Sequence, residues 1–415
     1  MPDPQITLLV TLTGRDKPGV TSRLFALLAA HQLSVLDVEQ VVIRGHLVLG
    51  VLLSCDSEPD LTAIHREVTA AAADLDLEAE ITAGSGEPQR RRGRLHVTVL
   101  GSKLAPAAIA AIAGRIAASG ANIDRIGRLA NRPVTCIELE VSGADPGMLR
   151  TALARESVAQ QVDIAVQRGG LHRRAMRLVV MDVDSTLVTG EAIDLLAARA
   201  GCGEQAAELT AAAMRGELDF TAALRGRVAM LAGLSSGALA EVREELSLTP
   251  GARTLIRTLR RLGYRCGIVS GGFTQFTDGL AADLGLDFAA ANTLEVTGGR
   301  LTGRLTGRII DRPGKAQALR EFAAGAGVPL SQTVAVGDGA NDLDMIAAAG
   351  LGIAFNAKQA VREAADASLS VPHLDAILYL LGISRDDVEA ADAEDAALAD
   401  ASDPNAAAVG SRSAG

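Results

Sequence analysis

Apolar and polar positions change their spacing several times along this chain. Over roughly the first 170 residues, short strand-like apolar runs and helical segments follow one another in the order βαββαβ, and this order occurs twice. From residue 177 onward, apolar runs ending in acids, hydroxyls or glycines are separated by helical segments, as in a parallel sheet covered by helices. Residues 188 to about 250 interrupt that alternation with an Ala-rich helical pattern. We therefore expect two small domains followed by a larger α/β domain with a helical insertion.

The two N-terminal domains are expected to share one fold. Strands of the first copy are expected at residues 6–13, 35–42, 47–54 and 77–82. The pattern recurs about 87 residues later, where Leu95-His-Val-Thr-Val-Leu-Gly101 aligns with the first strand and Ala108 to Ser119 with the first helix. Since βαββαβ is the order of a ferredoxin-like fold, we predict one such domain over residues 1–86 and another over 94–168.

Two carboxylates end the first strand of the larger domain. The run Arg177-Leu-Val-Val-Met-Asp182-Val-Asp184-Ser-Thr186 is apolar until it reaches Asp182, and a second acid follows two residues later. In an open α/β sheet, ligands bind outside the carboxyl ends of the strands, and this spacing aims both acids at one point there. Two acids in one site suggest a nucleophile and a metal ligand.

Three later segments supply what such a site needs. Gly267-Ile-Val-Ser270-Gly271-Gly272 is a strand whose hydroxyl and bare glycine N–H groups suit phosphate oxygens. Lys315 follows at the start of a helix, in a chain where only four of the 40 Lys and Arg residues are lysines. A compact ammonium fits between a carboxylate and a phosphoryl group. Thr333-Val-Ala-Val-Gly337-Asp338-Gly-Ala-Asn341-Asp342 again delivers acids at the end of a strand.

These four segments, in this order, resemble the motifs of the haloacid dehalogenase superfamily of aspartate-nucleophile phosphotransferases. The resemblance implies a Rossmann-like catalytic domain over residues 174–385 with a helical cap at about 188–250. It implies Asp182 as the nucleophile, Asp184 as the general acid and base, and Ser270 with the Gly271 amide as phosphoryl ligands. Asn341 and Asp342 would orient Lys315 and the outer metal shell.

An all-oxygen ligand set is expected to hold Mg²⁺. Asp182, the backbone carbonyl of Asp184 and Asp338 form a hard set that suits this ion, and no His or Cys cluster suggests zinc. An EF-hand loop starting at Asp182 is disfavoured, because its sixth position is Leu187 instead of Gly and its twelfth is Ile193 instead of Glu. The segment around Gly337 remains open to the simpler interpretation of a β-turn.

The helical insertion narrows the resemblance to the phosphoserine phosphatases, in which a Glu, a Met, a Phe and an Arg stand at matching spacings. The corresponding residues of this chain are Glu191, Met214, Phe220 and Arg227. Glu191 would pair with an α-ammonium group, Arg227 would bind an α-carboxylate bidentately, and the other two would form an apolar lid. The implied reaction is Mg²⁺-dependent hydrolysis of O-phospho-L-serine, the last step of serine biosynthesis. Three alternatives remain. The enzyme could hydrolyse another small phosphomonoester, the chain could be an amino-acid sensor whose phosphatase domain is inactive, or the four residues could have structural roles only.

The turn Asp16-Lys-Pro-Gly19 in the first domain resembles the ligand loop of ACT domains, which bind amino acids. Asp16 either binds an amino group or caps the following helix. The second copy has Ser-Lys-Leu-Ala-Pro at this place, so docking or dimerisation is considered for it instead. From the resemblance we expect a homodimer and feedback by serine or another amino acid.

Composition restricts partners and location. The net charge of −10 and the 2% of aromatic residues argue against nucleic acid as a partner. Apolar runs are shorter than a bilayer span requires, and Met-Pro-Asp-Pro-Gln is no secretory signal, so we expect a cytoplasmic protein without membrane contact. Residues 386–415 are acidic and rich in Ala, Ser and Gly, which predicts a disordered tail.

Overall fold

The computed structural model describes residues 6–55, 60–85, 94–214 and 217–402. Contacts divide the chain into two compact units, residues 1–90 and 91–415, and each is described by itself. Among the helices described, none is both long and apolar enough to cross a bilayer.

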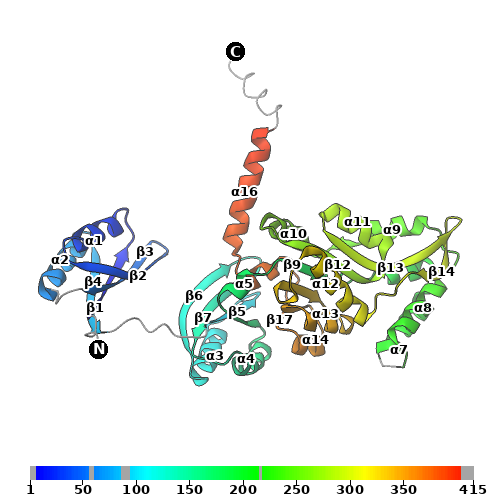
Figure 1. Cartoon of the computed structure of the whole chain (residues 1–415), viewed down its shortest axis with the longest axis horizontal. Coiled ribbons are helices and arrows are strands. Elements are labelled where there is room, and N and C mark those ends of the chain that lie inside the picture. Colours follow the sequence, from blue (N-terminus) through cyan, green and yellow to red (C-terminus); the bar gives the residue numbers. More distant parts are fainter. Residues whose placement is uncertain (1–5, 56–59, 86–93, 215–216, 403–415) are drawn as a thin grey trace, which may run out of the picture. The chain divides into compact units, whose positions relative to one another are not determined.

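The first unit is a four-stranded antiparallel sheet with two helices on one face (Figure 1). Its elements are β1 (Ile6–Arg15), α1 (Val20–Leu28), β2 (Leu33–Ile43), β3 (His46–Cys55), α2 (Leu61–Ala73) and β4 (Leu77–Ser85). The sheet order is β2-β3-β1-β4, with every neighbouring pair antiparallel. Leu8, Val10 and Leu12 alternate toward the helices and are at most 2% exposed. The predicted βαββαβ fold is confirmed.

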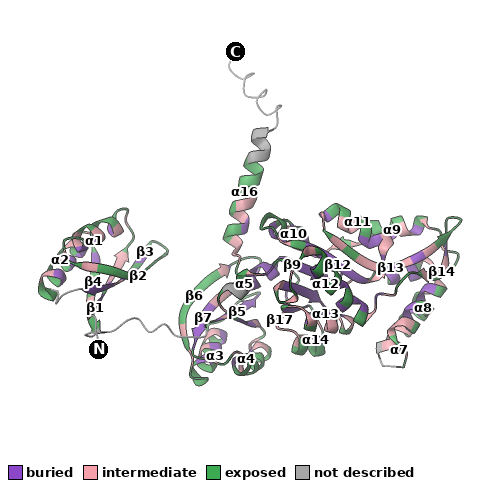
Figure 2. Cartoon of the chain, viewed as in Figure 1, coloured by how far each residue is buried: buried purple, intermediate pink, exposed green. Residues whose placement is uncertain are grey.

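The edge strand β2 of this unit is exposed along almost its whole length (Figure 2), although its sequence LSVLDVEQVVI is largely apolar. Its exposed apolar side chains, 40–67% accessible, are Val35, Leu36, Val38, Val41, Val42 and Ile43. A long apolar edge strand is a template for pairing with another chain.

The second unit begins with a domain of the same topology. Its elements are β5 (Leu95–Gly101), α3 (Pro106–Ala118), β6 (Asn122–Ala130), β7 (Thr135–Ser142), α4 (Pro146–Gln160) and β8 (Asp163–Arg168). The sheet order β6-β7-β5-β8 repeats that of the first unit.

This second small domain is docked on the larger one. Leu100, Cys136 and Ala165, on the sheet face without helices, belong to the same buried cluster as Tyr379 of the larger domain. At the edge of the contact, the Ser370 N–H donates to Asp163 Oδ2 at 2.6 Å. The shared core makes the two domains one compact unit, in agreement with the docking role considered for the second copy.

The larger domain is a seven-stranded sheet between two layers of helices (Figure 1). Its strands are β9 (Leu178–Met181), β12 (Arg265–Phe273), β13 (Phe288–Thr297), β14 (Arg300–Thr306), β15 (Thr333–Gly337), β16 (Leu351–Phe355) and β17 (Ala367–Leu369). Its helices are α5 (Leu171–Arg174), α10 (Ala252–Arg261), α11 (Thr274–Leu284), α12 (Arg312–Ala326), α13 (Leu343–Ala348), α14 (Gln359–Ala364) and α15 (Ile377–Leu380). The order is β14-β13-β12-β9-β15-β16-β17, parallel except for β14. This is the predicted Rossmann-like sheet, with β9 between β12 and β15.

A helical cap is inserted after β9, as predicted. It comprises β10 (Val188–Thr189), α6 (Ala192–Arg199), α7 (Gly203–Met214), α8 (Phe220–Met230), α9 (Gly237–Glu245) and β11 (Ser247–Leu248). The short strands β10 and β11 pair with each other and form the stalk of the cap. Leu224 and Val228 of α8 share a buried cluster with Leu294 and Leu301, so the cap packs on the β13–β14 hairpin.

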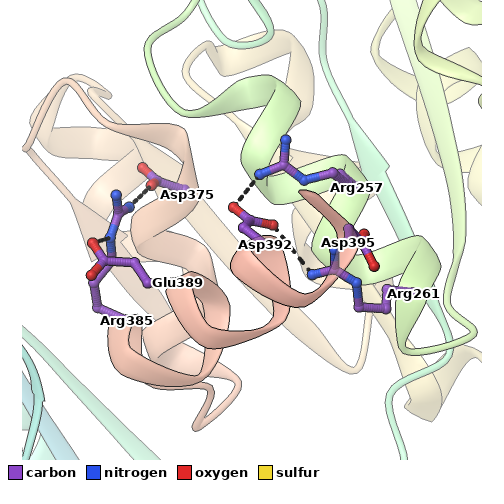
Figure 3. Close-up of polar contacts among 7 residues, drawn as sticks. All are labelled: Arg257, Arg261, Asp375, Arg385, Glu389, Asp392 and Asp395. Atoms are coloured by element: carbon purple, nitrogen blue, oxygen red, sulfur yellow. Dashed lines mark hydrogen bonds and ion pairs between the residues drawn. The ribbon is translucent and has the colours of Figure 1, made fainter. Parts of the chain in front are cut away.

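The C-terminal segment corrects one prediction. Residues 386–402, expected to be disordered, form most of α16 (Arg385–Ser402), while residues 403–415 lie outside the described part. The acids of this helix are paired with arginines: Asp392 with Arg257 and Arg261, and Asp395 with Arg261 (Figure 3). Composition alone could not reveal these partners, which lie more than 130 residues earlier in the chain.

Candidate active site

Three adjacent strands carry the predicted catalytic residues to one edge of the sheet. Asp182 follows the last residue of β9, Ser270 lies near the end of β12, and Asp338 follows β15. Because β9 pairs in parallel with both neighbours, their carboxyl ends meet at this edge. The Asp182 N–H donates to the Val336 carbonyl at 2.8 Å and extends the β9–β15 ladder to the carboxylate itself.

Lys315 lies buried between two of the acids. Its side chain is 1% exposed, and its Nζ lies 2.6 Å from Asp182 Oδ1 and 2.7 Å from Asp342 Oδ1. Burial opposes the charged ammonium, but the two carboxylates outweigh it and raise the pKa of Lys315. Burial, and next the charge of Asp342, raises the pKa of Asp182, which Lys315 partly offsets. The lysine is therefore a fixed positive charge beside the inferred nucleophile.

The start of the lysine helix is fixed by a side-chain cap. Asp311 precedes α12, and its Oδ1 accepts a hydrogen bond from the Gly314 N–H at 2.9 Å. Such a cap satisfies one of the N–H groups that a helix start leaves unpaired. Lys315 lies in the first turn after it, so its backbone position is well defined.

Three carboxylates form a candidate metal site. Oxygen atoms of Asp182, Asp338 and Asp342 lie within 4.8 Å of one another. Burial, and then the charge of Asp342, raises the pKa of Asp338 to about 6. One ammonium faces three acids here, so a divalent cation with a preference for oxygen fits the uncompensated charge. The structure thus brings together the expected Asp182 and Asp338, with Asp342 as a third neighbour.

Asp342 and Asp338 are each held by a further hydrogen bond. The Gly339 N–H donates to Asp342 Oδ2 at 3.0 Å, and the Thr186 hydroxyl donates to Asp338 Oδ1 at 3.1 Å. A Cβ at Gly337 would lie 2.4 Å from Asp342 Cγ, so this strand end requires glycine. Asn341, in the short helix 340–342, lies beside the same turn.

Asp184 faces the turn that follows Ser270. Its Oδ2 accepts a hydrogen bond from the Ser270 hydroxyl at 3.0 Å, and its Oδ1 accepts one from the Ala192 N–H at 3.1 Å. The Gly272 N–H donates in turn to Ser270 Oγ at 2.7 Å. Because Ala192 is the first residue of α6, the proposed acid and base is bonded to the cap as well as to the core.

The cap places Phe220 over the glycine turn. A Cβ built on Gly271 would lie 3.1 Å from Phe220 Cζ, so the ring rests on the backbone where a phosphoryl group is expected. Phe220 begins α8, which Asp219 caps by accepting from the Ala222 N–H at 2.7 Å. Met214 ends α7, but its side chain lies outside the described residues, so its predicted lid role stays a prediction.

Arg227 and Glu191 lie together on the site side of the cap. Arg227 is 9% exposed, and its Nη1 donates to Thr210 Oγ1 at 3.2 Å and lies 4.0 Å from Glu191 Oε2. Its Nε is buried without a hydrogen-bond partner among the described residues. Burial, and then the nearby Asp194 and Asp184, raises the pKa of Glu191. A buried guanidinium with an unused donor is suited to an incoming carboxylate.

Two supporting residues were missed by the sequence reasoning. Thr249, at the end of the cap, donates from its hydroxyl to the Thr186 carbonyl at 2.7 Å. Asn292 of β13, 1% exposed, bonds to the backbone of Gly271 and Ile310. The only signal for Asn292 was an amide at the end of the apolar run Phe288-Ala-Ala-Ala, and Thr249 gave none.

The ligand loop of the first unit lines a surface pocket of about 420 Å³. The lining residues are Asp16, Lys17, Pro18, Gly19, Val20, Thr21, Ser22 and Gln40. Gly19, with φ 93°, is the N-cap of α1, and no side chain caps this helix. Asp16 therefore is not the helix cap, and its binding of an amino group stays a prediction. Lys17 is engaged elsewhere, with Asp76 at 2.7 Å.

Comparison with known proteins gives a consistent result. Residues 179–347 match the family model of haloacid dehalogenase-like hydrolases, and residues 6–82 and 95–167 match two models of ACT domains. A phosphoserine phosphatase of Streptomyces coelicolor is 61% identical over 390 residues, covering 93% of this chain and 94% of that protein. A phosphoserine phosphatase of Mycobacterium tuberculosis is 54% identical over 396 residues, covering 94% of this chain and 97% of that protein.

Solved structures are similar as well. The crystal structure of a probable phosphoserine phosphatase from Vibrio cholerae has a TM-score of 0.55 at 34% identity, covering 69% of this chain and 86% of that one. A hydrolase of the same superfamily from Salmonella enterica has a TM-score of 0.60 at 28% identity, covering 69% of this chain and 98% of that one.

Proposed function

Because this chain belongs to the phosphoserine phosphatase family of the haloacid dehalogenase-like hydrolases, we propose that it hydrolyses O-phospho-L-serine to L-serine and phosphate. In a cell this would be the last step of serine biosynthesis. The observation that carries the proposal is the position of Asp182, at the tip of the central strand beside Ser270, Lys315 and Asp338.

In the first half-reaction, an Asp182 oxygen attacks the phosphorus atom in line with the serine oxygen. The bond between phosphorus and the serine oxygen breaks, and Asp184 gives its proton to that oxygen, leaving an aspartyl phosphate. Lys315, 2.6 Å from Asp182 Oδ1, orients the nucleophile and compensates negative charge. The Ser270 hydroxyl and the Gly271 N–H would hold the phosphoryl oxygens.

In the second half-reaction, Asp184 takes a proton from water, and the water oxygen attacks the same phosphorus. The bond between phosphorus and Asp182 breaks, which releases phosphate and restores the carboxylate. Mg²⁺, bound through Asp182, the Asp184 carbonyl and Asp338, would neutralise the phosphoryl charge. Because Ala192 of the cap holds Asp184, closing the cap would also position the proton carrier.

Substrate choice would come from the cap. Arg227 has a buried Nε without a described partner, and Glu191 Oε2 comes no closer to its Nη1 than 4.0 Å. Neither charge is therefore fully paired. An α-carboxylate beside Arg227 and an α-ammonium beside Glu191 would complete both pairs. Phe220, with Met214 as the predicted second lid residue, would exclude water from the phosphoryl group.

The decisive test is Mg²⁺-dependent phosphate release from a panel of O-phospho-L-serine, O-phospho-L-threonine and sugar phosphates. We expect turnover to be highest on O-phospho-L-serine and to vanish on chelation. Asp182→Asn should abolish turnover while the fold is retained, since the amide cannot act as the nucleophile. A preferred sugar phosphate would refute the substrate, and turnover by the Asp182→Asn enzyme would refute the mechanism.

We further propose that the pocket beside Asp16 binds serine as a feedback effector. The uncapped N-terminus of α1 offers N–H groups to a carboxylate, and Asp16 offers a partner for an ammonium. Calorimetric titration of the full chain with serine should give binding that Asp16→Asn weakens. Equal affinity in both proteins would rule out this pocket.

A homodimer formed through the ACT domains is the proposed assembly, and the cytoplasm stays the predicted compartment. The exposed apolar side chains of β2, including Val35 and Ile43, support pairing with a second copy. One chain has a mass of 42.7 kDa, and sedimentation equilibrium should give twice this mass. Replacing Val38 and Val41 by lysine should then yield monomers.

A further inference from the structure

We propose that Asn292 is a positioning residue for the reaction, because its amide holds the phosphoryl-binding turn and the lysine helix in one arrangement. The inference rests on the proposed function, in which Gly271 binds the phosphoryl group and Lys315 orients the nucleophile. Asn292 itself would touch neither the substrate nor the metal.

The need for such a residue arises from an irregularity in the sheet. Strands β12 and β13 pair in parallel from Gly267 to Val269, and pairing resumes only where Phe273 lies opposite Asn292. Between these two paired positions, β12 has three unpaired residues, 270–272, whereas β13 has one, residue 291. The turn that carries Ser270 and Gly271 therefore lacks regular strand partners on this side.

The Asn292 amide supplies the missing contacts. Its Nδ2 donates to the Gly271 carbonyl at 2.8 Å, and its Oδ1 accepts from the Ile310 N–H at 2.8 Å. The side chain is 1% exposed, so water does not compete for these bonds. A backbone carbonyl and a backbone N–H from different segments are thus joined by one planar group.

The second contact connects the turn to the lysine. Ile310 immediately precedes Asp311, the N-cap of α12, and Lys315 lies in the first turn of this helix. Ile310 is 4% exposed and packs in the cluster that includes Val269 and Leu319. Through Ile310, the amide fixes the distance between the Gly271 turn and the helix that aims Lys315 at Asp182.

Few other side chains could perform this role. An apolar residue of the same size would leave the Gly271 carbonyl and the Ile310 N–H buried without partners. A carboxylate could still accept from Ile310 but, when ionised, would repel the Gly271 carbonyl. Since a displacement of about 1 Å can reduce turnover about 100-fold, losing both bonds should act mainly on kcat.

The test compares two variants of Asn292 with a control residue that bonds to the same strand, β13. Gln275 of α11 donates from its Nε2 to the Leu294 carbonyl at 2.9 Å and accepts from the Leu294 N–H at 3.4 Å. It thus makes the same kind of amide clamp on β13, two residues from Asn292, and its described side-chain hydrogen bonds go to Thr274 and Leu294 instead of Gly271 or Ile310. The variants are Asn292→Leu, Asn292→Asp and the control Gln275→Met, all in the full chain.

With saturating Mg²⁺ and O-phospho-L-serine, we expect kcat to fall about 100-fold in Asn292→Leu and less in Asn292→Asp, which keeps the contact with Ile310. KM should change less than about threefold, because Arg227 and Glu191 are untouched. Gln275→Met should lower the thermal midpoint without changing kcat by more than about twofold. Hydrogen exchange at Ile310 should accelerate in Asn292→Leu only.

A folded Asn292→Leu protein with kcat within about twofold of the parent would overturn the proposal, as would an equal loss of kcat in Gln275→Met. If Asn292→Leu does not fold, the kcat of Asn292→Asp decides in the same way. An inactive parent protein would instead refute the proposed function, and the hydrogen-exchange comparison would then judge the clamp alone.

Discussion

Arg227→Met should remove recognition of the substrate carboxylate while leaving phosphoryl transfer in place. The side chain is 9% exposed, so its replacement needs a residue that fills similar space without a charge. Methionine does so and keeps an unbranched stem on α8. The variant tests whether the buried guanidinium serves the substrate or only the packing of the cap.

The size of the effect follows from the unused donors. Nη1 is engaged with Thr210, whereas Nε has no described partner, so Nε and Nη2 are suited to a bidentate carboxylate. A hydrogen bond between charged groups contributes about 1.5 kcal/mol at the lower end of the usual range. Two of them give about 3 kcal/mol, or about a 150-fold decrease in kcat/KM for O-phospho-L-serine.

Phosphoethanolamine provides the internal reference, because it has the same phosphate and ammonium groups without the carboxylate. We expect Arg227→Met to change kcat/KM for phosphoethanolamine by less than about fivefold, and the parent enzyme to disfavour this substrate by about the same 150-fold. Arg225→Met is the matched control, since Arg225 lies on the same helix and is exposed. It should leave both substrates unaffected.

Equal losses on both substrates would refute this reasoning, because the loss would then come from a disturbed cap. A loss below about tenfold on O-phospho-L-serine would also contradict the assigned carboxylate contact. Circular dichroism and the thermal midpoint separate either outcome from simple unfolding.

Three further predictions concern stability. Lys315→Met should cost about 3–5 kcal/mol in denaturant unfolding without metal, because Asp182 and Asp342 lose their buried counter-charge; a loss below about 1 kcal/mol would contradict it. Burial raises the pKa of Glu138, but its ion pairs with His96 and Arg173 outweigh burial and lower this pKa to about 2. Because this folded pKa lies below the ordinary value of 4.5, ionised Glu138 stabilises the folded state above pH 4.5, and this stabilisation is lost toward pH 2. In thermal unfolding, Glu138→Gln should therefore be less stable than the parent by about 1–3 kcal/mol above pH 4.5, and the difference should vanish toward pH 2. A difference that does not depend on pH would refute the pairing. Arg385→Ala should lower the free energy of unfolding more than Arg261→Ala, because Asp375, the partner of Arg385, is 5% exposed, whereas the pairs of Arg261 with α16 lie on the surface. The reverse order in denaturant unfolding would contradict this.

The order of strands and the motif positions could be predicted because both depend on local patterns. Period-two apolar runs and the turns between them located the strands of the first small domain and the first strand of the second. An acid or hydroxyl directly after an apolar run was enough to place Asp182, Ser270 and Asp338 at strand ends. These properties require only neighbouring residues, so the sequence contained them.

The supporting contacts could not be predicted, because they join residues far apart in the chain. The hydrogen bond from Thr249 to Thr186 spans 63 positions, and the one from Arg132 to Glu389 spans 257. The acidic segment after residue 385 was misjudged for the same reason. Its acids resembled a solvated tail until α10 placed Arg257 and Arg261 beside them (Figure 3).

By itself, the sequence determined which chemical groups are present, at which strand end each lies, and therefore the type of reaction. Only the tertiary structure decided that Lys315 lies between Asp182 and Asp342, that Asn292 joins two catalytic segments, and that the second small domain is docked through a shared core. The physical reason is that periodicity fixes local conformation, whereas the pairing of buried polar groups depends on which strands and helices pack side by side.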